Sequence, residues 1–219
     1  MTQVIKSKGF TFLLLALLAF SGLGLELILG LLIEPLLFGK AMPDFTVMEN
    51  ILHWVLTCIV WAAVAFGLLR WSQRKGLNPL GQKESIGRGR WLIAALLLAV
   101  SIAVSIWDWN GFKILKEFEY NGWLMFIFQY IYYIVETVLV LLIIIFGQQA
   151  GELWFKKKSV PWGGILAALT WGLVHSLTKG DLLIGLIACF GALLYGIAYL
   201  VVKRNVYIAY PLILLMFIL

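Results

Sequence analysis

The chain has 219 residues, of which 63% are hydrophobic and 13% are charged, and its mean hydropathy is +0.98. Soluble domains have about 45–50% apolar and about 25% charged residues, so this composition excludes a soluble globular protein. The net charge of +6 requires no nucleic-acid partner, because Lys and Arg gather in the cytoplasmic loops of membrane proteins. The composition predicts an integral membrane protein whose main partner is the lipid bilayer.

Apolar runs of the length that crosses a bilayer, about 17–25 residues, recur along the chain. Six runs are bounded by charged or turn residues, and a seventh has only 14 residues. They predict an all-α, polytopic transmembrane bundle of six to seven spans, with residues 1–219 forming a single integral membrane domain. The seven runs cover residues 10–38, 47–69, 91–107, 123–146, 161–177, 182–202 and 206–219.

The fourth run continues into a polar segment that ends before a cluster of lysines. If residues 123–155 form one helix, it measures about 50 Å, which is longer than a bilayer is thick. Such a helix must tilt, break near Gly147 or project into the cytoplasm.

Basic residues separate clearly between the two sides of the predicted bundle. Thirteen of the 17 Lys and Arg residues fall on the same side as the N-terminus. Because positively charged loops stay in the cytoplasm, this bias predicts a cytoplasmic N-terminus and a multi-pass protein of the cell membrane. The thirteen are Lys6, Lys8, Arg70, Arg74, Lys75, Lys83, Arg88, Arg90, Lys156, Lys157, Lys158, Lys203 and Arg204.

Ionisable side chains inside the hydrocarbon are costly, so each one is neutralised, paired or functional. Glu34, His53 and Asp108 lie near the outer ends of their spans, which predicts anchoring at the membrane interface. Glu26 lies deeper, in a glycine-rich stretch. A protonated Glu26 could donate a hydrogen bond to a neighbouring helix, in a structural or a functional role. The other two ionisable residues of the spans are Glu136 and His175.

Glu136 and His175 are the candidate catalytic residues. His175 lies one helical turn after Trp171 on the fifth predicted span. On straight helices the depths of Glu136 and His175 differ by about 7 Å, so a tilted interface could bring them together. There the carboxylate could activate water and the imidazole could stabilise an oxyanion, or the two could form a structural hydrogen bond. Glu136 belongs to a polar stripe predicted to face the interior, formed by Gln129, Tyr132, Tyr133 and Glu136.

Neither the cysteines nor the histidines form a ligand motif. Cys58 and Cys189 lie 131 positions apart within apolar runs, which indicates buried thiols. Only two histidines are present, whereas zinc usually takes three or four protein ligands, so we predict no metal and no cofactor. In the sixth run, Ala188, Ala192 and Gly196 recur every four residues, which predicts a face for tight helix packing.

Three segments between Phe146 and Leu219 form a recognisable order. They are a helix leading into a basic turn (FGQQAGELWFKKKSVPWGGI), an aromatic-x-x-x-His motif at Trp171 and His175, and the segment FGALLYGIAYLVVKRNVYIAYPLI. This order resembles the CPBP family of CAAX-protease and bacteriocin-processing intramembrane proteases, also called the Abi family. The resemblance implies a CPBP-like helical core over residues 123–219 and an intramembrane endopeptidase whose substrate is a peptide or a prenylated protein.

The family motifs are only partly matched. Family members carry EExxxR, FxxxH and a final HxxxN or HxxxD motif; the family glutamate activates water and the histidines stabilise the oxyanion. Here Trp171 takes the place of Phe in the second motif, and apolar residues occupy the places of the third. The diglutamate would fall near residues 141–143, which are apolar, so the nearest acid is Glu136. The resemblance therefore implies that Glu136 acts with His175.

The sequence leaves three functions open. The first is a divergent CPBP-like protein, either a peptidase that uses Glu136 and His175 or an inactive relative. The second is a non-enzymatic membrane subunit, such as the substrate-recognition part of a transporter or a bacteriocin self-immunity protein. The third is a scaffold without a ligand. A peptidase requires the pair within about 7 Å around a polar cavity. A transporter predicts a midplane cavity lined by broken helices and by Gln129, Tyr132 and Tyr133.

Overall fold

The computed structural model describes residues 2–80 and 84–219, with side chains from Ser7 onward. Lys83, one of the basic residues used to orient the chain, lies outside the described residues. The fold is 84% helical, and the described residues include no strand, which confirms the predicted all-α class. Five helical segments among them are long and apolar enough to cross a membrane: Ser7–Phe38, Val47–Arg74, Arg88–Asp108, Lys113–Phe155 and Leu182–Val201.

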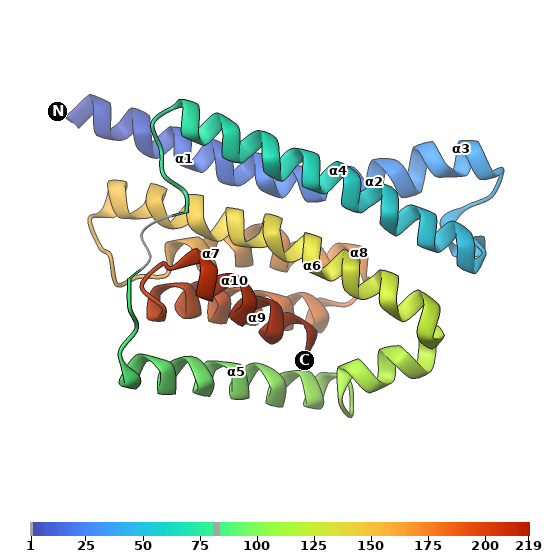
Figure 1. Cartoon of the computed structure of the whole chain (residues 1–219). Helices are drawn as coiled ribbons and strands as arrows, with labels where there is room; N and C mark the ends of the chain where they lie inside the picture. Colours follow the sequence, from blue (N-terminus) through green and yellow to red (C-terminus); the bar gives the residue numbers. More distant parts are fainter. Residues whose placement is uncertain (1, 81–83) are drawn as a thin grey trace.

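The helices surround one long central helix, α6. In Figure 1, α1 and α4 lie on one side of α6, while α7 to α10 lie on the other side, between α6 and α5. The described elements are α1 (Thr2–Leu23), α2 (Leu25–Ile28), η1 (Leu29–Ile33), α3 (Glu34–Phe38), η2 (Met42–Asp44), α4 (Val47–Arg74), α5 (Arg88–Asp108), α6 (Lys113–Phe155), α7 (Trp162–Ala167), η3 (Ala168–Gly172), α8 (Leu173–Thr178), α9 (Leu182–Val201) and α10 (Val206–Ile218).

The centre of the bundle is the middle of α6. Every residue from Leu139 to Phe146 is at most 3% exposed. A helix that is apolar on all sides must be surrounded by other elements, and α1, α4, α7 and α10 all pack against α6. The core therefore surrounds α6, and the polar residues at positions before Leu139 are held at the edge of this core.

Helices α6, α7 and α9 meet at glycines. A Cβ atom on Gly163 would overlap the carbonyl group of Ile144, and one on Gly164 would lie 2.9 Å from the Cα of Gly196 and 3.0 Å from the carbonyl oxygen of Ala192. Glycine is required because the backbones themselves are in contact. This contact confirms that the small-residue face of α9 is used for tight packing.

The backbone of α6 departs from helical geometry at Gly122, where φ is 67° and ψ is 170°. Of the three alternatives considered for this helix, the break near Gly147 is wrong, because α6 continues through that residue. Gly147 is instead a packing position, where an added Cβ would lie 3.2 Å from the Cα of Gly163. Gly122 can adopt the positive φ that other residues avoid, so the chain turns there before it enters the core.

Two of the predicted spans are divided by π-helical turns. The first span contains η1 between α2 and α3, and the fifth contains η3 between α7 and α8. A π-turn places one additional residue within a helical turn, and such turns are frequent at functional sites. Both π-turns lie close to ionisable residues in the sequence. Glu34 follows η1 directly, and His175 is the third residue after η3 ends.

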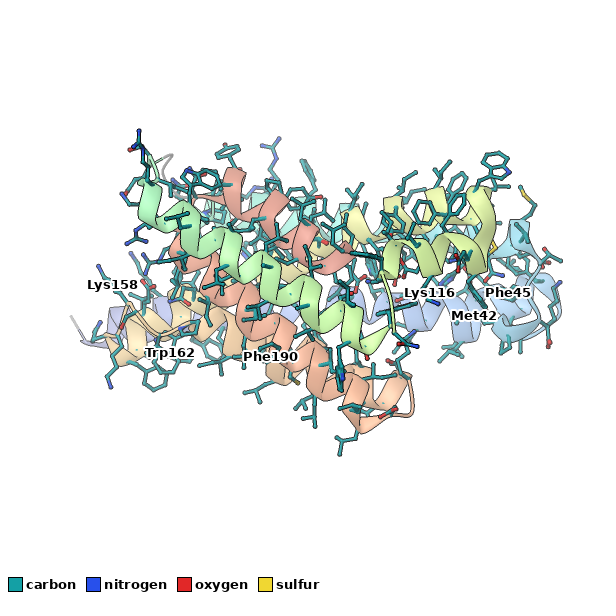
Figure 2. The ribbon with its side chains drawn as sticks, turned by 90° about the horizontal axis from the view of Figure 1, so that it is seen from below. Met42, Phe45, Lys116, Lys158, Trp162 and Phe190 are labelled. Carbon is teal, nitrogen blue, oxygen red and sulfur yellow. The ribbon has the colours of Figure 1, made fainter. Side chains whose placement is uncertain are left out.

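The basic loops gather at one end of the bundle. Figure 2 shows Lys158 at one end and Lys116 at the other. Hydrogen bonds connect the basic segments that are distant in sequence. Arg204 Nη2 donates to the Lys158 carbonyl at 3.0 Å, and Arg90 Nη1 donates to the Val201 carbonyl at 2.9 Å. The segments that the sequence assigned to one side are therefore neighbours in the fold.

Candidate functional site

Glu136 lies on α6, three residues before the buried segment that begins at Leu139. It is 7% exposed, and its Oε1 accepts a hydrogen bond from Nε1 of Trp171 at 3.0 Å. Trp171 lies in the π-turn η3 and is 6% exposed. The carboxylate is thus held by a tryptophan from a different part of the chain.

His175 lies on α8 and is half-buried. Its Nδ1 is 2.7 Å from the carbonyl oxygen of Trp171, and the two rings are in edge contact with centroids 4.6 Å apart. A carbonyl oxygen can only accept, so Nδ1 carries the proton. In the neutral ring Nε2 is then an acceptor, and it can donate a hydrogen bond only when the imidazole is protonated.

The two candidate catalytic residues therefore share Trp171 as a hydrogen-bond partner. The indole binds Glu136 and the backbone carbonyl binds His175, so the described hydrogen bonds join the pair through this residue. The neighbouring gap is apolar and too small to admit a water molecule. It is lined by Thr137, Val140, Trp171, Tyr195, Ile213 and Phe217.

The polar stripe on α6 has partners on the same helix and on distant helices. Gln129 Nε2 donates to the Tyr133 hydroxyl at 2.8 Å, and the Tyr133 hydroxyl donates to Glu117 at 2.6 Å. Tyr132 instead donates to Oε1 of Glu26 at 2.8 Å, which links α6 to α2. Tyr132 and Tyr133 therefore separate the stripe into two networks.

Lys113 and Glu117 are buried residues whose role the sequence analysis missed. Lys113 is 9% exposed, donates from Nζ to the Phe217 carbonyl at 2.9 Å, and lies 4.8 Å from the ring centre of Tyr133. Glu117 is 3% exposed. The signal was their four-residue spacing, which places opposite charges on one face of a helix.

A second cluster forms where α2, α3 and α4 meet. His53 Nδ1 lies 2.7 Å from Glu34 Oε2, and His53 Nε2 lies 3.4 Å from Glu26 Oε1. Glu34 is 0% exposed and His53 is 3% exposed, so both are buried rather than anchored at the interface as predicted. Asp108 differs from them, because it is exposed at the end of α5.

The hairpin between α3 and α4 explains this burial. Glu34 lies four residues before α3 ends, and His53 lies six residues after α4 begins. At a rise of about 1.5 Å per residue these positions have similar depths in two antiparallel helices. The pairing of Glu34 with His53 was therefore predictable from the hairpin. The distance of each residue from the end of its own predicted span did not reveal this pairing.

Glu26 contacts neighbouring helices as predicted, but its Oε1 accepts the hydrogen bond from Tyr132 on α6 rather than donating one, and it lies 3.4 Å from His53 Nε2 on α4. Cys58 and Cys189 are both free and half-buried. Among the described residues, no three His, Cys, Asp or Glu side chains converge as a metal-ligand set.

A cavity of about 600 Å³ opens at the basic end, and its lining includes Arg90, Lys158 and Arg204. No residue of the two polar clusters lines this cavity. That position differs from the midplane cavity that a transporter predicts.

No known protein family, curated protein or solved structure matches this chain. The two polar clusters and the arrangement of the helices therefore carry the functional inference.

Proposed function

We propose that this chain is a divergent CPBP-like intramembrane peptidase of the cell membrane, with Glu136 and His175 as its catalytic residues. The observation that supports this function is the position of Trp171, whose indole donates to Glu136 and whose backbone carbonyl accepts from His175. The proposed substrate is a peptide segment or a prenylated protein, as the resemblance implies. The aromatic-x-x-x-His motif at Trp171 and His175 supports the same pair.

The proposed reaction uses Glu136 as the base. Glu136 takes a proton from water through its Oε2 atom while the water oxygen attacks the carbonyl carbon of the scissile bond. The protonated His175 donates from Nε2 to the oxyanion, and its orientation is fixed by the bond from Nδ1 to Trp171. When the tetrahedral intermediate collapses, the C–N bond breaks and the leaving amine takes the proton from Glu136.

Substrate entry requires movement near η3, because the gap beside Trp171 is closed. The π-turn lies at this place, so the helix is locally less regular there than in α7 or α8. Separation of η3 from α10, where the rings of Trp171 and Phe217 are in contact, would expose Glu136 to water and to a peptide from the bilayer.

We also propose six to seven spans with the N-terminus in the cytoplasm. The gathering of the basic loops at one end of the bundle supports this topology. The segment from Trp162 to Thr178 is about 25 Å long and α10 is about 20 Å long at 1.5 Å per residue, against a hydrocarbon thickness of about 30 Å. These two segments are therefore the shortest of the seven proposed spans.

The test is cleavage of prenylated and leader-peptide substrates by purified protein in lipid vesicles. We expect Glu136→Gln and His175→Ala to lower the cleavage rate by about 100-fold or more, because each removes an acid–base or charge-stabilising group. His175→Gln should retain part of the rate, since an amide can still donate to an oxyanion. The matched control is Glu119→Gln on the exposed outer surface of α6, which should cleave like the wild type.

A non-enzymatic membrane role is the second candidate, favoured by one specific observation. The gap beside Trp171 is apolar and does not admit water, which suits a structural or binding role for Glu136 and His175. Absence of cleavage by folded wild-type protein, with unchanged peptide binding by the Glu136→Gln variant, would reject the peptidase and support this role.

A further inference from the structure

The buried Glu26, His53 and Glu34 side chains form a cluster that the proposed peptidase does not use. They come from α2, α4 and α3, which lie side by side at one end of the molecule (Figure 1). The side chain of Glu34 is 0% exposed and that of His53 is 4% exposed, whereas that of Glu26 is 29% exposed. Glu26 is therefore the accessible member and Glu34 the enclosed one.

The distance between Glu34 and His53 requires a proton. Oε2 of Glu34 and Nδ1 of His53 are 2.7 Å apart. Two lone pairs repel each other at this separation, so either Nδ1–H donates to the carboxylate or a protonated carboxyl donates to Nδ1. In both arrangements one proton lies between the two residues.

The opposite side of the imidazole faces a second carboxylate. Oε1 of Glu26 accepts from the Tyr132 hydroxyl at 2.8 Å and lies 3.4 Å from Nε2 of His53. A proton on Nε2 therefore points towards Glu26. A neutral imidazole that donates its one proton from Nδ1 to Glu34 leaves both buried carboxylates charged, and burying uncompensated charge is costly. One additional proton, which gives either a doubly protonated ring beside the Glu34 carboxylate or a neutral ring beside a Glu34 carboxylic acid, leaves the Glu34–His53 pair with no net charge.

The π-turn η1 places the two glutamates on the same face. Glu26 and Glu34 are eight residues apart, and eight residues of straight α-helix turn through about 800°, which leaves them about 80° apart around the axis. The π-turn between them absorbs one residue and reduces this angle to about 20°. His53 can therefore contact both carboxylates with its two nitrogens.

Further polar atoms continue from the cluster along α4. His53, Thr57 and Trp61 follow one another every four residues, so they lie on one face of that helix. Oγ1 of Thr57, Nε1 of Trp61 and Oε1 of Glu34 are buried and make no hydrogen bond to other described residues. Such groups in a packed interior need an explanation. The Thr57 hydroxyl and the Glu34 oxygen can accept a proton and so can belong to a proton path, whereas the indole N–H of Trp61 can only donate a hydrogen bond.

In the described ion pairs of the cluster, neither Glu26 nor Glu34 is paired with a lysine or an arginine. On α6, Tyr132 and Glu136 face the cluster, and on α4 the Cys58 thiol is within electrostatic range of Glu26. On α8, His175 is also within this range. The nearest paired cation at the outer end, Lys40, binds Glu49 instead. The other elements packed around the cluster contribute apolar side chains.

We propose that Glu26, His53 and Glu34 form an intramembrane proton-binding site. A proton from water enters on the Glu26 side, passes through the imidazole of His53, and is held between His53 and Glu34. The ligand is a proton rather than a metal ion, because the two imidazole nitrogens face opposite carboxylates and the three side chains do not converge on one point. This site gives the protein a means of responding to proton concentration from within the bilayer, independently of Glu136 and His175.

The test uses the small number of histidines in the chain. Only His53 and His175 contribute imidazole signals, so nitrogen-15 labelling of histidine followed by NMR in lipid vesicles resolves both, with His175→Asn for assignment. At about pH 8, which is above the ordinary histidine pKa of about 6.5, a free imidazole has lost one proton. We expect both ring nitrogens of wild-type His53 to carry protons at this pH, or the infrared spectrum to show a carboxylic-acid C=O band from Glu34.

The variants separate the site from other effects. Glu34→Gln should abolish the shared-proton signal, and Glu34→Asp should do the same through a shorter side chain if the first variant does not fold. Glu26→Gln should retain the proton but slow its exchange with deuterium by about tenfold or more, because the accessible member of the path is lost. Glu49→Gln, on the same helix but paired with Lys40, is the matched control and should leave both signals unchanged.

Two outcomes would overturn the proposal. One is a wild-type His53 with a bare ring nitrogen at about pH 8 and no carboxylic-acid band. The other is a shared-proton signal that persists in both Glu34 variants. Glu136→Gln should leave the His53 signals unchanged, so failure of the peptidase proposal is distinguishable from failure of this one.

Discussion

At the scale of single residues, Glu117 shows how one buried carboxylate organises its surroundings. It accepts hydrogen bonds from the hydroxyls of Tyr130 at 2.9 Å and Tyr133 at 2.6 Å, and from the amide of Gln129 at 3.2 Å. All three donors come from the helix beyond Gly122, so Glu117 connects the two parts of α6 on either side of the non-helical residue. The charge of Glu117 is therefore part of what fixes this turn.

We expect Glu117→Gln to destabilise the fold by about 2 kcal/mol, because hydrogen bonds to a charged acceptor are lost and an amide donor faces other donors. Unfolding in mixed micelles, followed by circular dichroism, measures this change. The control is Glu119→Gln, two residues away and exposed, which should change the free energy of unfolding by less than about 0.5 kcal/mol. Equal effects of the two substitutions would show that Glu117 has no special role.

Single residues were the hardest part to predict from the sequence. The depth of Glu136 and His175 along their helices suggested that they could meet, but the residue to which both form hydrogen bonds, Trp171, was not predicted as their common partner. Depth also misplaced Glu34 and His53, because counting from the end of one span does not show what the adjacent helix contributes. The location of a buried partner depends on packing between helices, which one sequence does not display.

At the scale of elements, the contact between α7 and α9 depends on glycine. We expect Gly196→Ala to destabilise the protein by about 1–3 kcal/mol, since the added methyl group would overlap the backbone of Gly164. The measurement is again unfolding in mixed micelles, with the wild type as reference. A stability equal to that of the wild type would mean that the two helices separate without cost.

The matched control for this prediction is Gly67→Ala on α4, where an added Cβ meets nothing within 4 Å. There alanine should maintain or raise stability, because it favours the helix over glycine by about 1 kcal/mol. The two substitutions add the same methyl group, so their difference isolates the contact between α7 and α9.

Most helices were predictable from hydropathy, whereas their interruptions were not. Predicted spans 47–69, 91–107 and 182–202 agree closely with α4, α5 and α9, because charged and turn residues mark their ends. The π-turns η1 and η3 consist mainly of apolar residues within apolar runs, so nothing in the hydropathy distinguishes them from the helices around them. The non-helical backbone at Gly122 was equally hard to predict, because a glycine beside a predicted span can lie in a helix, a turn or a packing contact.

At the scale of the whole molecule, the distribution of basic residues makes the topology testable. In a background with Cys58→Ser and Cys189→Ala, single cysteines can be placed at exposed positions on either end of the bundle. In intact cells, we expect a membrane-impermeant maleimide to label Glu119→Cys but not Gln73→Cys or Lys157→Cys, because the proposed topology places the basic loops in the cytoplasm. Permeabilised cells provide the control, in which all three should react. Labelling of Lys157→Cys in intact cells would reverse the proposed orientation.

Composition predicted the class of the whole molecule, because so few charged residues cannot cover a soluble surface of this size. Charge bias also predicted which loops lie together, and the contacts of Arg90 and Arg204 agree with it. The central position of α6 in the bundle was less evident from the sequence. Its apolar segment reads as one span among several, and only the packing of α1, α4, α7 and α10 around it shows that it is central.

The π-turn η1 makes the pairing of Glu26 and Glu34 a matter of chain length as well as of residue identity. If residues 29–33 became regular α-helix with no change in length, Glu34 would rotate by about 100° relative to Glu26, and His53 could no longer contact both carboxylates. Deletion of one residue from this segment would instead leave the two glutamates seven α-helical residues apart and keep them about 20° apart around the axis. A single codon insertion could therefore have added the π-turn to an ancestor whose two glutamates were seven residues apart, without separating them.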